Sequence, residues 1–199
     1  SQNVDLGNWF NYRNFAVEMW LRPGASQTPN ACIIDDNYWF TGRGWICQQN
    51  NAATNQYIFS CYTPYGSVGV TFTLTANLWQ HVTLVKSNTA LQVYVNGVMV
   101  TSAPWNYGAI YYDGSQFLRL GRWGGGGRYW NGQMDEVRIF NSDITAAQIA
   151  ANMTSNYPQT TNNLVAYYKM DEPDNSPTIF NATSIPSRDG VTVGNPNFL

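Results

Sequence analysis

The sequence divides into at least ten short segments in which apolar and polar residues alternate, and turn residues separate these segments. The clearest segment is 91–101, LQVYVNGVMVT, where Asn96-Gly97 joins two alternating runs. Asn-Gly favours the type I′ turn of a two-residue hairpin. Period-two alternation buries one face of each strand. Many such strands with regular turns predict an all-β fold, an antiparallel two-sheet β-sandwich.

Residues 145–153 form the one segment with helical signals. Thr145 and Gln148 have the spacing of a capping box, and Ile144 and Ile149 stand where a hydrophobic staple would place them. We expect one short α-helix here, which decorates the sandwich and does not define it.

The length of 199 residues is enough for one domain with a full core. We expect a single domain over 1–199, in which 160–199 supplies a C-terminal strand and a polar tail that packs on the sandwich. No apolar run approaches the roughly 20 residues of a membrane-spanning helix, so we expect no membrane insertion. A net charge of −2 and a pI near 5.2 argue against a nucleic-acid partner.

Four consecutive glycines, 124–127, lie between a strand that begins near 117 and a second strand that ends near 140. Trp123, Tyr129 and Trp130 flank these glycines. Consecutive glycines cost backbone entropy on folding, and the flanking aromatic rings offer flat stacking surfaces. Two interpretations follow: a ligand-binding surface, or a long hairpin tip whose tryptophans fold back onto the core.

Several segments resemble laminin G-like jelly-roll domains of the concanavalin A-like lectin and glucanase superfamily, to which the pentraxins are related. The resemblance is carried by FAVEMWLRP at 15–23, WQHV at 79–82, YVNG at 94–97, LRLG at 118–121, NGQMDEVRIF at 131–140, ITAAQI at 144–149 and LVAYYKMDE at 164–172. It implies two curved antiparallel sheets and a role in glycan binding or adhesion, often beside an enzyme domain or other modules of the same parent protein.

The resemblance also implies that the loops 36–44 and 122–130 open at one edge of the jelly roll. Aromatic rings stack on pyranose faces, and planar polar groups bind sugar hydroxyls. We expect Trp20, Trp45 and Trp79 to lie in the core. The candidate glycan-binding residues are Trp39, Trp123, Tyr129, Trp130, Asp36, Arg43, Arg122 and Arg128.

The carboxylates argue against an enzyme. Glycoside hydrolysis needs two carboxylates about 5–9 Å apart, and no strand carries the alternating Glu-x-Asp-x-x-Glu pattern of the related glycosidases. For Glu18 we expect an ion pair with Arg138 in the sandwich. The single histidine, His81, has no obvious nucleophile partner and is expected to be structural.

Calcium is the one cofactor expected. Asp135 resembles the aspartate that holds a structural ion in related glycosidases, and backbone carbonyls near 5–11 would complete the site. The alternative is an aspartate that fixes the end of a strand by accepting backbone N–H bonds. The cysteines leave two possibilities open: a Cys47–Cys61 disulfide across a hairpin, or three free buried thiols including Cys32.

Only 11% of the residues are charged while 15% are aromatic, a balance common in secreted β-proteins that handle neutral polymers. The function expected first is a non-catalytic carbohydrate-binding or adhesion module, located outside the cell or on a cell or virion surface. The rivals are a structural or protein-interaction module of an adhesin or fibre, and a glycoside hydrolase.

Overall fold

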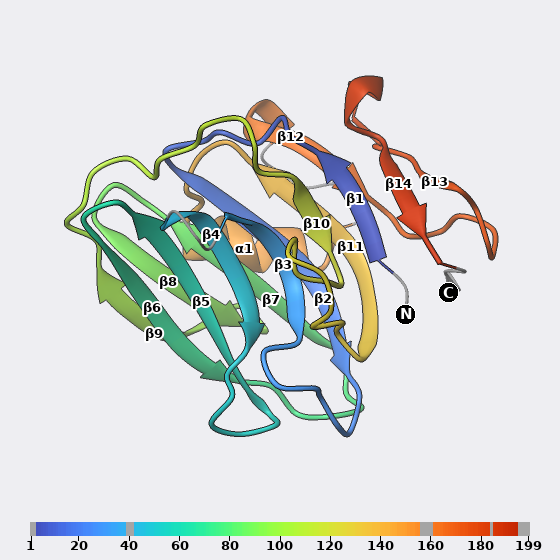
Figure 1. The fold of residues 1–199 in the computed structure, drawn as a ribbon, viewed down its shortest axis with the longest axis horizontal. Coiled ribbons are helices and arrows are strands. Elements are labelled where there is room, and N and C mark those ends of the chain that lie inside the picture. The colour runs from blue at the N-terminus through green and yellow to red at the C-terminus, as the bar shows by residue number, and fades with distance from the viewer. Residues whose placement is uncertain (1–2, 39–41, 156–160, 184, 195–199) are drawn as a thin grey trace.

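The computed structural model describes residues 3–38, 42–155, 161–183 and 185–194, which fold into two antiparallel sheets packed face to face (Figure 1). The eight-stranded sheet has the order β13-β14-β1-β10-β3-β4-β5-β6, and the six-stranded sheet has the order β12-β11-β2-β7-β8-β9. The strands are β1 Asn3–Gly7, β2 Phe15–Pro23, β3 Cys32–Tyr38, β4 Arg43–Gln49, β5 Gln56–Thr63, β6 Gly66–Thr73, β7 Gln80–Lys86, β8 Ala90–Val95, β9 Val98–Pro104, β10 Leu118–Leu120, β11 Gly132–Phe140, β12 Leu164–Tyr168, β13 Thr178–Ile179 and β14 Gly190–Val193.

The predicted β-sandwich is confirmed, and so is its clearest hairpin. Asn96 and Gly97 join β8 to β9 with φ angles of 50° and 77°, as a type I′ turn requires. At the other end of the molecule β14 pairs with β1 and β13 pairs with β14. The C-terminal segment therefore extends the large sheet, and the N- and C-terminal parts of the chain lie at the same edge (Figure 1).

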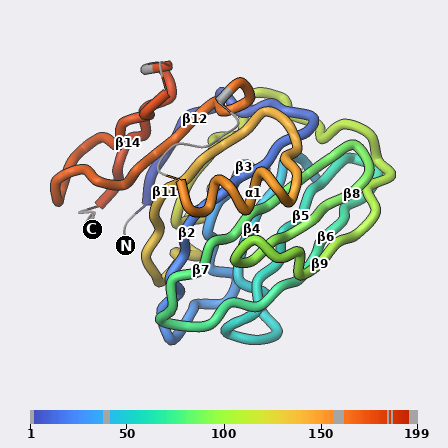
Figure 2. The backbone as a smooth tube through the Cα atoms, turned by 180° about the vertical axis from the view of Figure 1, so that it is seen from behind, coloured from blue at the N-terminus to red at the C-terminus, as the bar shows by residue number. Residues whose placement is uncertain are grey.

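The predicted helix is α1, Ala146–Met153, and it has the predicted capping box between Thr145 and Gln148. It lies over the outer face of the six-stranded sheet (Figure 2). Ile144 and Ile149 pack there in an apolar cluster with Phe140. The other ordered helical turns among the described residues are two short 3-10 segments, Thr161–Asn163 and Pro186–Arg188. None of the described residues is in a helix that is both long and apolar enough to span a bilayer.

The tryptophans that lie in the core differ from those that were predicted to lie there. Trp45 is fully buried in the core, as expected, and Trp105, which was not expected there, is 2% exposed. Trp20 is only partly buried and Trp79 is 36% exposed, so their core assignment was wrong. The register explains Trp20: its neighbours Met19 and Leu21 face the core, which turns Trp20 to the outer face, edge-on to His81.

The three cysteines are free and buried. Cys47 lies opposite Phe59 in the β4–β5 ladder, and Cys61 lies opposite Trp45. The two thiols predicted to face each other are therefore offset by two residues along the hairpin.

A β-bulge interrupts the alternation of side chains along β11. The register to β2 shifts between Asp135 and Arg138, and Glu136 has a φ of 52°. Met134 therefore packs against the core together with Val137, although strict alternation placed them on opposite faces. Asp135 lies opposite Trp20, toward the outer face.

The predicted Glu18–Arg138 ion pair does not form, although the two residues are cross-strand neighbours. Arg138 pairs with Glu136 and donates to the carbonyl oxygen of Asn152 at 3.0 Å. Glu18 accepts a hydrogen bond from the Asn152 side chain at 3.1 Å. The end of α1 thus enters the polar cluster, which sequence spacing between strands could not show.

Burial raises the pKa of Glu18 from 4.5 to about 8, and nearby Arg138 and the Asn152 hydrogen bond only partly oppose this rise. The folded chain then keeps a proton that the unfolded chain has lost, so the free energy of unfolding falls as the pH rises from about 4.5 to 8. Burial lowers the pKa of His81 from 6.5 to about 4. His81 therefore makes the free energy of unfolding rise with pH, but only below about pH 6.5. Asp35, with a pKa raised to about 7, adds to the Glu18 effect.

We therefore predict that the melting temperature falls when the pH is raised from about 6.5 to about 8. Glu18→Gln should show a smaller fall. Over this pH range its free energy of unfolding should drop by on the order of 1–2 kcal/mol less than that of the wild-type protein. Thermal melts of both proteins across this range provide the measurement. An equal slope in the variant would show that Glu18 does not titrate differently in the folded chain.

The tryptophan positions give a second prediction. Trp45→Ala should destabilise the fold by about 3–5 kcal/mol, because it empties a fully buried site. Trp79→Ala should cost about 1 kcal/mol or less, because the side chain is partly in solvent. Denaturant unfolding of both variants measures the difference, and equal losses would contradict the placement of these side chains.

Candidate functional site

The segment 121–131, called here the glycine loop, folds over the outer face of the eight-stranded sheet (Figure 1). Backbone hydrogen bonds join it to β3: the Gly121 N–H donates to Ile33 at 2.8 Å, and the Cys32 N–H donates to Arg128 at 2.8 Å. The loop also closes on itself through a bond from Trp130 to Gly121 at 3.0 Å. The glycine loop is therefore fixed to the sheet at both ends.

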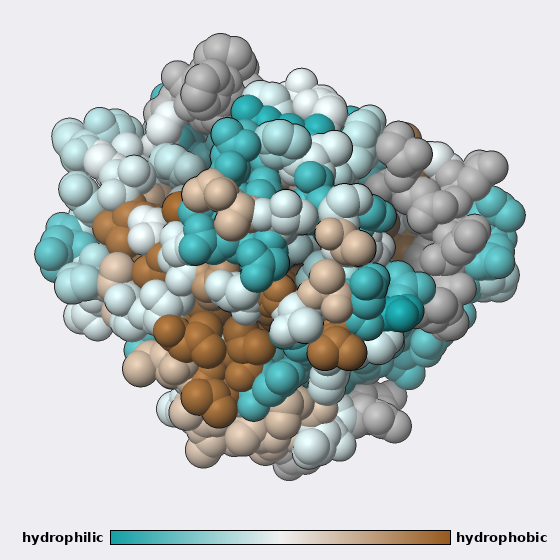
Figure 3. Space-filling model, turned by 90° about the horizontal axis from the view of Figure 1, so that it is seen from below, coloured by the Kyte–Doolittle hydropathy of each residue, from teal (hydrophilic) through white to brown (hydrophobic). Residues whose placement is uncertain are grey.

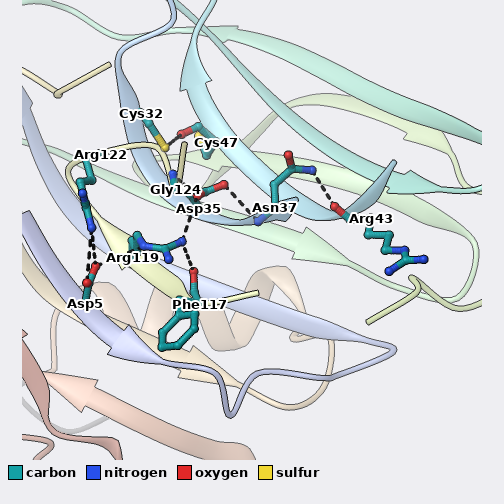
Figure 4. A network of polar contacts seen from close by, with 10 residues as sticks. All are labelled: Asp5, Cys32, Asp35, Asn37, Arg43, Cys47, Phe117, Arg119, Arg122 and Gly124. Carbon is teal, nitrogen blue, oxygen red and sulfur yellow. Dashed lines mark hydrogen bonds and ion pairs between the residues drawn. The ribbon is translucent and has the colours of Figure 1, made fainter. Parts of the chain in front are cut away.

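A buried carboxylate holds the middle of the loop (Figure 4). Asp35 of β3 accepts the Gly124 N–H at 2.8 Å and the Asn37 N–H at 3.0 Å, and it lies 3.8 Å from the guanidinium of Arg119. Burial raises the pKa of Asp35 to about 7, and the bond from Gly124 and the charge of Arg119 oppose that rise. Asp35 thus fixes the height of the loop above the sheet.

Two of the glycines lie in close contact with neighbouring side chains. A Cβ at position 124 would lie 2.5 Å from Arg119 Nη1, and a Cβ at position 125 would lie 2.2 Å from the Trp123 ring. The glycine run therefore lets the loop lie flat on the sheet, and it does not by itself indicate a ligand.

A pocket of about 220 Å³ lies between the glycine loop and the sheet. The guanidinium of Arg128 lies over the Trp123 ring, 4.3 Å from its centre. The Gln48 Oε1 atom is buried without a hydrogen-bond partner. The lining residues are Asn30, Asn37, Ile46, Gln48, Tyr62, Trp123 and Arg128.

This lining combines apolar surface with planar polar groups. Trp123, Tyr62 and Ile46 provide apolar surface, and the remaining lining residues provide amide and guanidinium groups. Such a surface can contact the C–H face of a sugar ring and bind its hydroxyl groups. The described lining residues include no carboxylate, so they do not supply the pair that glycoside hydrolysis needs.

Of the predicted glycan-binding residues, Trp123 and Arg128 line this pocket. Arg122 instead lies 3.4 Å from Asp5, and Arg43 pairs with Asp113.

Tyr129 and Trp130 lie at the end of the glycine loop. Tyr129 bridges to Cys32 through its backbone, and Trp130 packs against the main core. Trp39 lies outside the described residues. Trp130 therefore folds back onto the core, as the hairpin-tip interpretation predicts, while Trp123 lines the pocket and its role in binding a ligand stays a prediction.

The loop predicted at 36–44 is mostly strand, because β3 runs to Tyr38 and β4 begins at Arg43. Asp36 lies opposite Trp45 and is 1% exposed. Burial, with a contribution from Asp35, raises the pKa of Asp36 well above its usual range. Asp36 therefore faces the interior of the sandwich and not the pocket.

Sequence reasoning missed Asn30, Asn37, Ile46, Gln48 and Tyr62. A signal for part of this set was present. In β4 the core residues Trp45 and Cys47 alternate with Ile46 and Gln48, which places the latter pair on the outer face.

Asp135, the predicted calcium ligand, accepts the N–H of Glu136 at 2.9 Å. Burial raises its pKa, and the neighbouring charges of Glu136 and Asp171 add to the rise. Within the described ranges, no three His, Cys, Asp or Glu side chains are arranged to hold a metal ion. A calcium ion at Asp135 therefore stays a prediction that depends on backbone carbonyls for its other ligands.

A protein-family sequence model matches residues 2–150, and its description is the concanavalin A-like lectin/glucanases superfamily. No curated protein gives a significant sequence match.

Solved structures share the fold at low identity. A Bacteroides ovatus protein proposed to bind carbohydrate is 22% identical with a TM-score of 0.77, over 100% of this chain and 58% of that one. Domain 4 of an extracellular arabinanase from Geobacillus stearothermophilus, solved with arabinotriose, is 17% identical with a TM-score of 0.56, over 74% and 68% of the two chains. The binding domain of botulinum neurotoxin DC, solved with SialylT, is 17% identical with a TM-score of 0.57, over 89% and 48%. The chain therefore spans little more than half the length of the Bacteroides protein.

The calcium expectation has a direct test. If an ion is bound at Asp135, a chelator should lower the melting temperature and added calcium should restore it, because a ligand of the folded state stabilises that state. Asp135→Ala should abolish the response, while Asp143→Ala, which removes an exposed carboxylate elsewhere, should keep it. An unchanged melt with chelator, together with no metal in elemental analysis, would end the calcium hypothesis.

Proposed function

Because the chain belongs to the concanavalin A-like lectin/glucanases superfamily, we propose that it is a non-catalytic carbohydrate-binding module. The module acts as one unit over 1–199, outside the cell or on a surface, beside other modules of its parent protein. The observation that carries this proposal is the pocket beside the glycine loop, which Trp123 and Arg128 line together with side chains of β3 and β4.

The chemistry of the pocket supports a sugar ligand. Sugar hydroxyls need hydrogen-bond donors and acceptors, and the pocket offers three amide side chains. One of them is Gln48, whose Oε1 atom has no hydrogen-bond partner. A buried acceptor without a donor is costly, and a ligand hydroxyl would satisfy it. Of the proteins with the same fold, the Bacteroides protein is proposed to bind carbohydrate and the Geobacillus domain was solved with arabinotriose, which supports the same class of ligand here.

The carboxylates support a binding role over hydrolysis. Glu18 lies under α1 on the opposite sheet, and Glu136 is paired with Arg138 there. Asp35 is held by Gly124 and Asn37. None of these three groups lines the pocket, so a catalytic pair is not placed against a ligand bound in it.

One observation favours a second candidate, a protein-interaction module. Apolar side chains gather on one face of the molecule (Figure 3). On the edge strand β9, Val98, Met99 and Val100 are 65%, 50% and 50% exposed. An exposed apolar edge strand can pair with a partner strand.

The carbohydrate proposal predicts that Trp123→Ala weakens glycan binding roughly 10- to 100-fold, by analogy with the loss of one stacked base. The melting temperature should change little, because Trp123 is only partly buried on the outside of the sheet. Trp79→Ala is the matched control: it also removes a partly exposed indole, yet it should leave binding unchanged. Titration calorimetry with the ligand found on a glycan array measures both variants.

Destabilisation by several kcal/mol without loss of binding in Trp123→Ala would contradict the proposal. A folded wild-type protein that binds no glycan on the array would favour the protein-interaction module instead.

A further inference from the structure

This inference rests on the proposed function and concerns the charge at the same pocket. Two arginines and two aspartates near the glycine loop balance each other. Arg119 lies 3.3 Å from Asp5 and 3.8 Å from Asp35, and Arg122 lies 3.4 Å from Asp5. Asp5 and Asp35 thus offset Arg119 and Arg122.

Arg128 is a third arginine near the glycine loop, in addition to Arg119 and Arg122. Its guanidinium forms no ion pair with any residue that the structure describes, and it stacks on the Trp123 ring. No carboxylate stands among the described lining residues of the pocket. Asp36, which is close in sequence to the pocket residues, lies in the sandwich interior, where burial raises its pKa. The described lining of the pocket therefore carries one positive charge and no carboxylate.

The backbone holds this charge in place. Arg128 has a φ of 51°, a left-handed conformation that is rare for residues with a side chain. Its carbonyl oxygen accepts the Cys32 N–H at 2.8 Å, which fixes the loop to β3 at this residue. The Trp123 ring then covers one face of the guanidinium and leaves its N–H groups to bind an acceptor at the edge.

Two unsatisfied groups therefore define the ligand. Arg128 lacks an anionic acceptor, and Gln48 Oε1 lacks a donor. A sugar that carries a carboxylate supplies both, since its carboxylate meets the guanidinium fork and a ring hydroxyl donates to the amide. We propose that the pocket selects an acidic sugar, a uronate or a sialate, whose carboxylate binds Arg128.

The pocket volume limits the size of the bound unit. About 220 Å³ is below the roughly 300–1,000 Å³ of pockets for drug-sized ligands. We therefore expect one acidic sugar unit in the pocket and the rest of an oligosaccharide outside it.

The test compares ligands that differ only in charge. Trigalacturonate is paired with its methyl ester, and sialyllactose is paired with lactose, so the two pairs distinguish a uronate from a sialate. We expect the acidic member of one pair to bind at least 10-fold more tightly than its neutral counterpart. That preference should shrink as salt is raised from about 50 to about 500 mM, because screening weakens exposed charge pairs.

Variants assign the preference to Arg128. Arg128→Gln should abolish the acidic preference, so that the acidic and neutral members of the pair bind about equally tightly. Arg128→Asn, which tolerates the left-handed backbone, should do the same if the glutamine variant folds poorly. Arg13→Gln removes the same charge at an exposed position before β2 and should keep the preference.

The outcomes separate this inference from the function on which it rests. Equal binding of acidic and neutral ligands, or an acidic preference that survives in Arg128→Gln, overturns the acidic-sugar proposal and leaves the carbohydrate-binding function standing. A sulfated neutral sugar that binds as tightly as the carboxylate also overturns it. No binding of any glycan overturns the proposed function itself.

Discussion

The contact between the Asp35 carboxylate and the Gly124 N–H determines how the two outer faces of the sandwich differ. The six-stranded sheet is covered by α1 through apolar packing around Ile149. The eight-stranded sheet is covered by the glycine loop, and the bond at 2.8 Å to Asp35 anchors that cover. Apolar packing fills the space that it covers, whereas a loop held by a few polar contacts leaves a pocket beneath it. The candidate site exists because the glycine loop, and not a packed helix, lies over β3 and β4.

Sequence patterns predicted the parts of the fold that depend on neighbouring residues. The β8–β9 hairpin is determined by Asn96-Gly97, and the start of α1 by Thr145 and Gln148, because in each case the interacting groups lie within a few residues. The alternation of β2 likewise placed Trp20 on the same side as Glu18. The error lay in treating that side as core, since apolar character alone does not show which face of a half-covered sheet is buried.

The site was harder to predict because its residues meet across the sheet. The unusual glycine run pointed to Trp123 and Arg128. Asn30 before β3, Gln48 in β4 and Tyr62 in β5 also line the pocket, but nothing in the sequence around them is unusual. The bulge at Glu136 gives a second example, since one inserted residue moved Met134 to the core face. Asp36 gives a third, because the length of β3 decides whether that side chain faces the interior or a loop. Register and strand length are long-range properties, and a single sequence specifies them only weakly.

We propose that the pocket under the glycine loop binds carbohydrate. The most direct measurement follows NMR signals of the isotope-labelled protein during titration with an oligosaccharide. We expect the signals of the Trp123 indole N–H and the Gln48 side-chain amide to shift together and saturably, while the signal of the Trp79 indole N–H stays in place. Shifts confined to Trp79 and Trp20, with Trp123 and Gln48 unchanged, would place the ligand on the opposite sheet and show that this pocket is not the carbohydrate site.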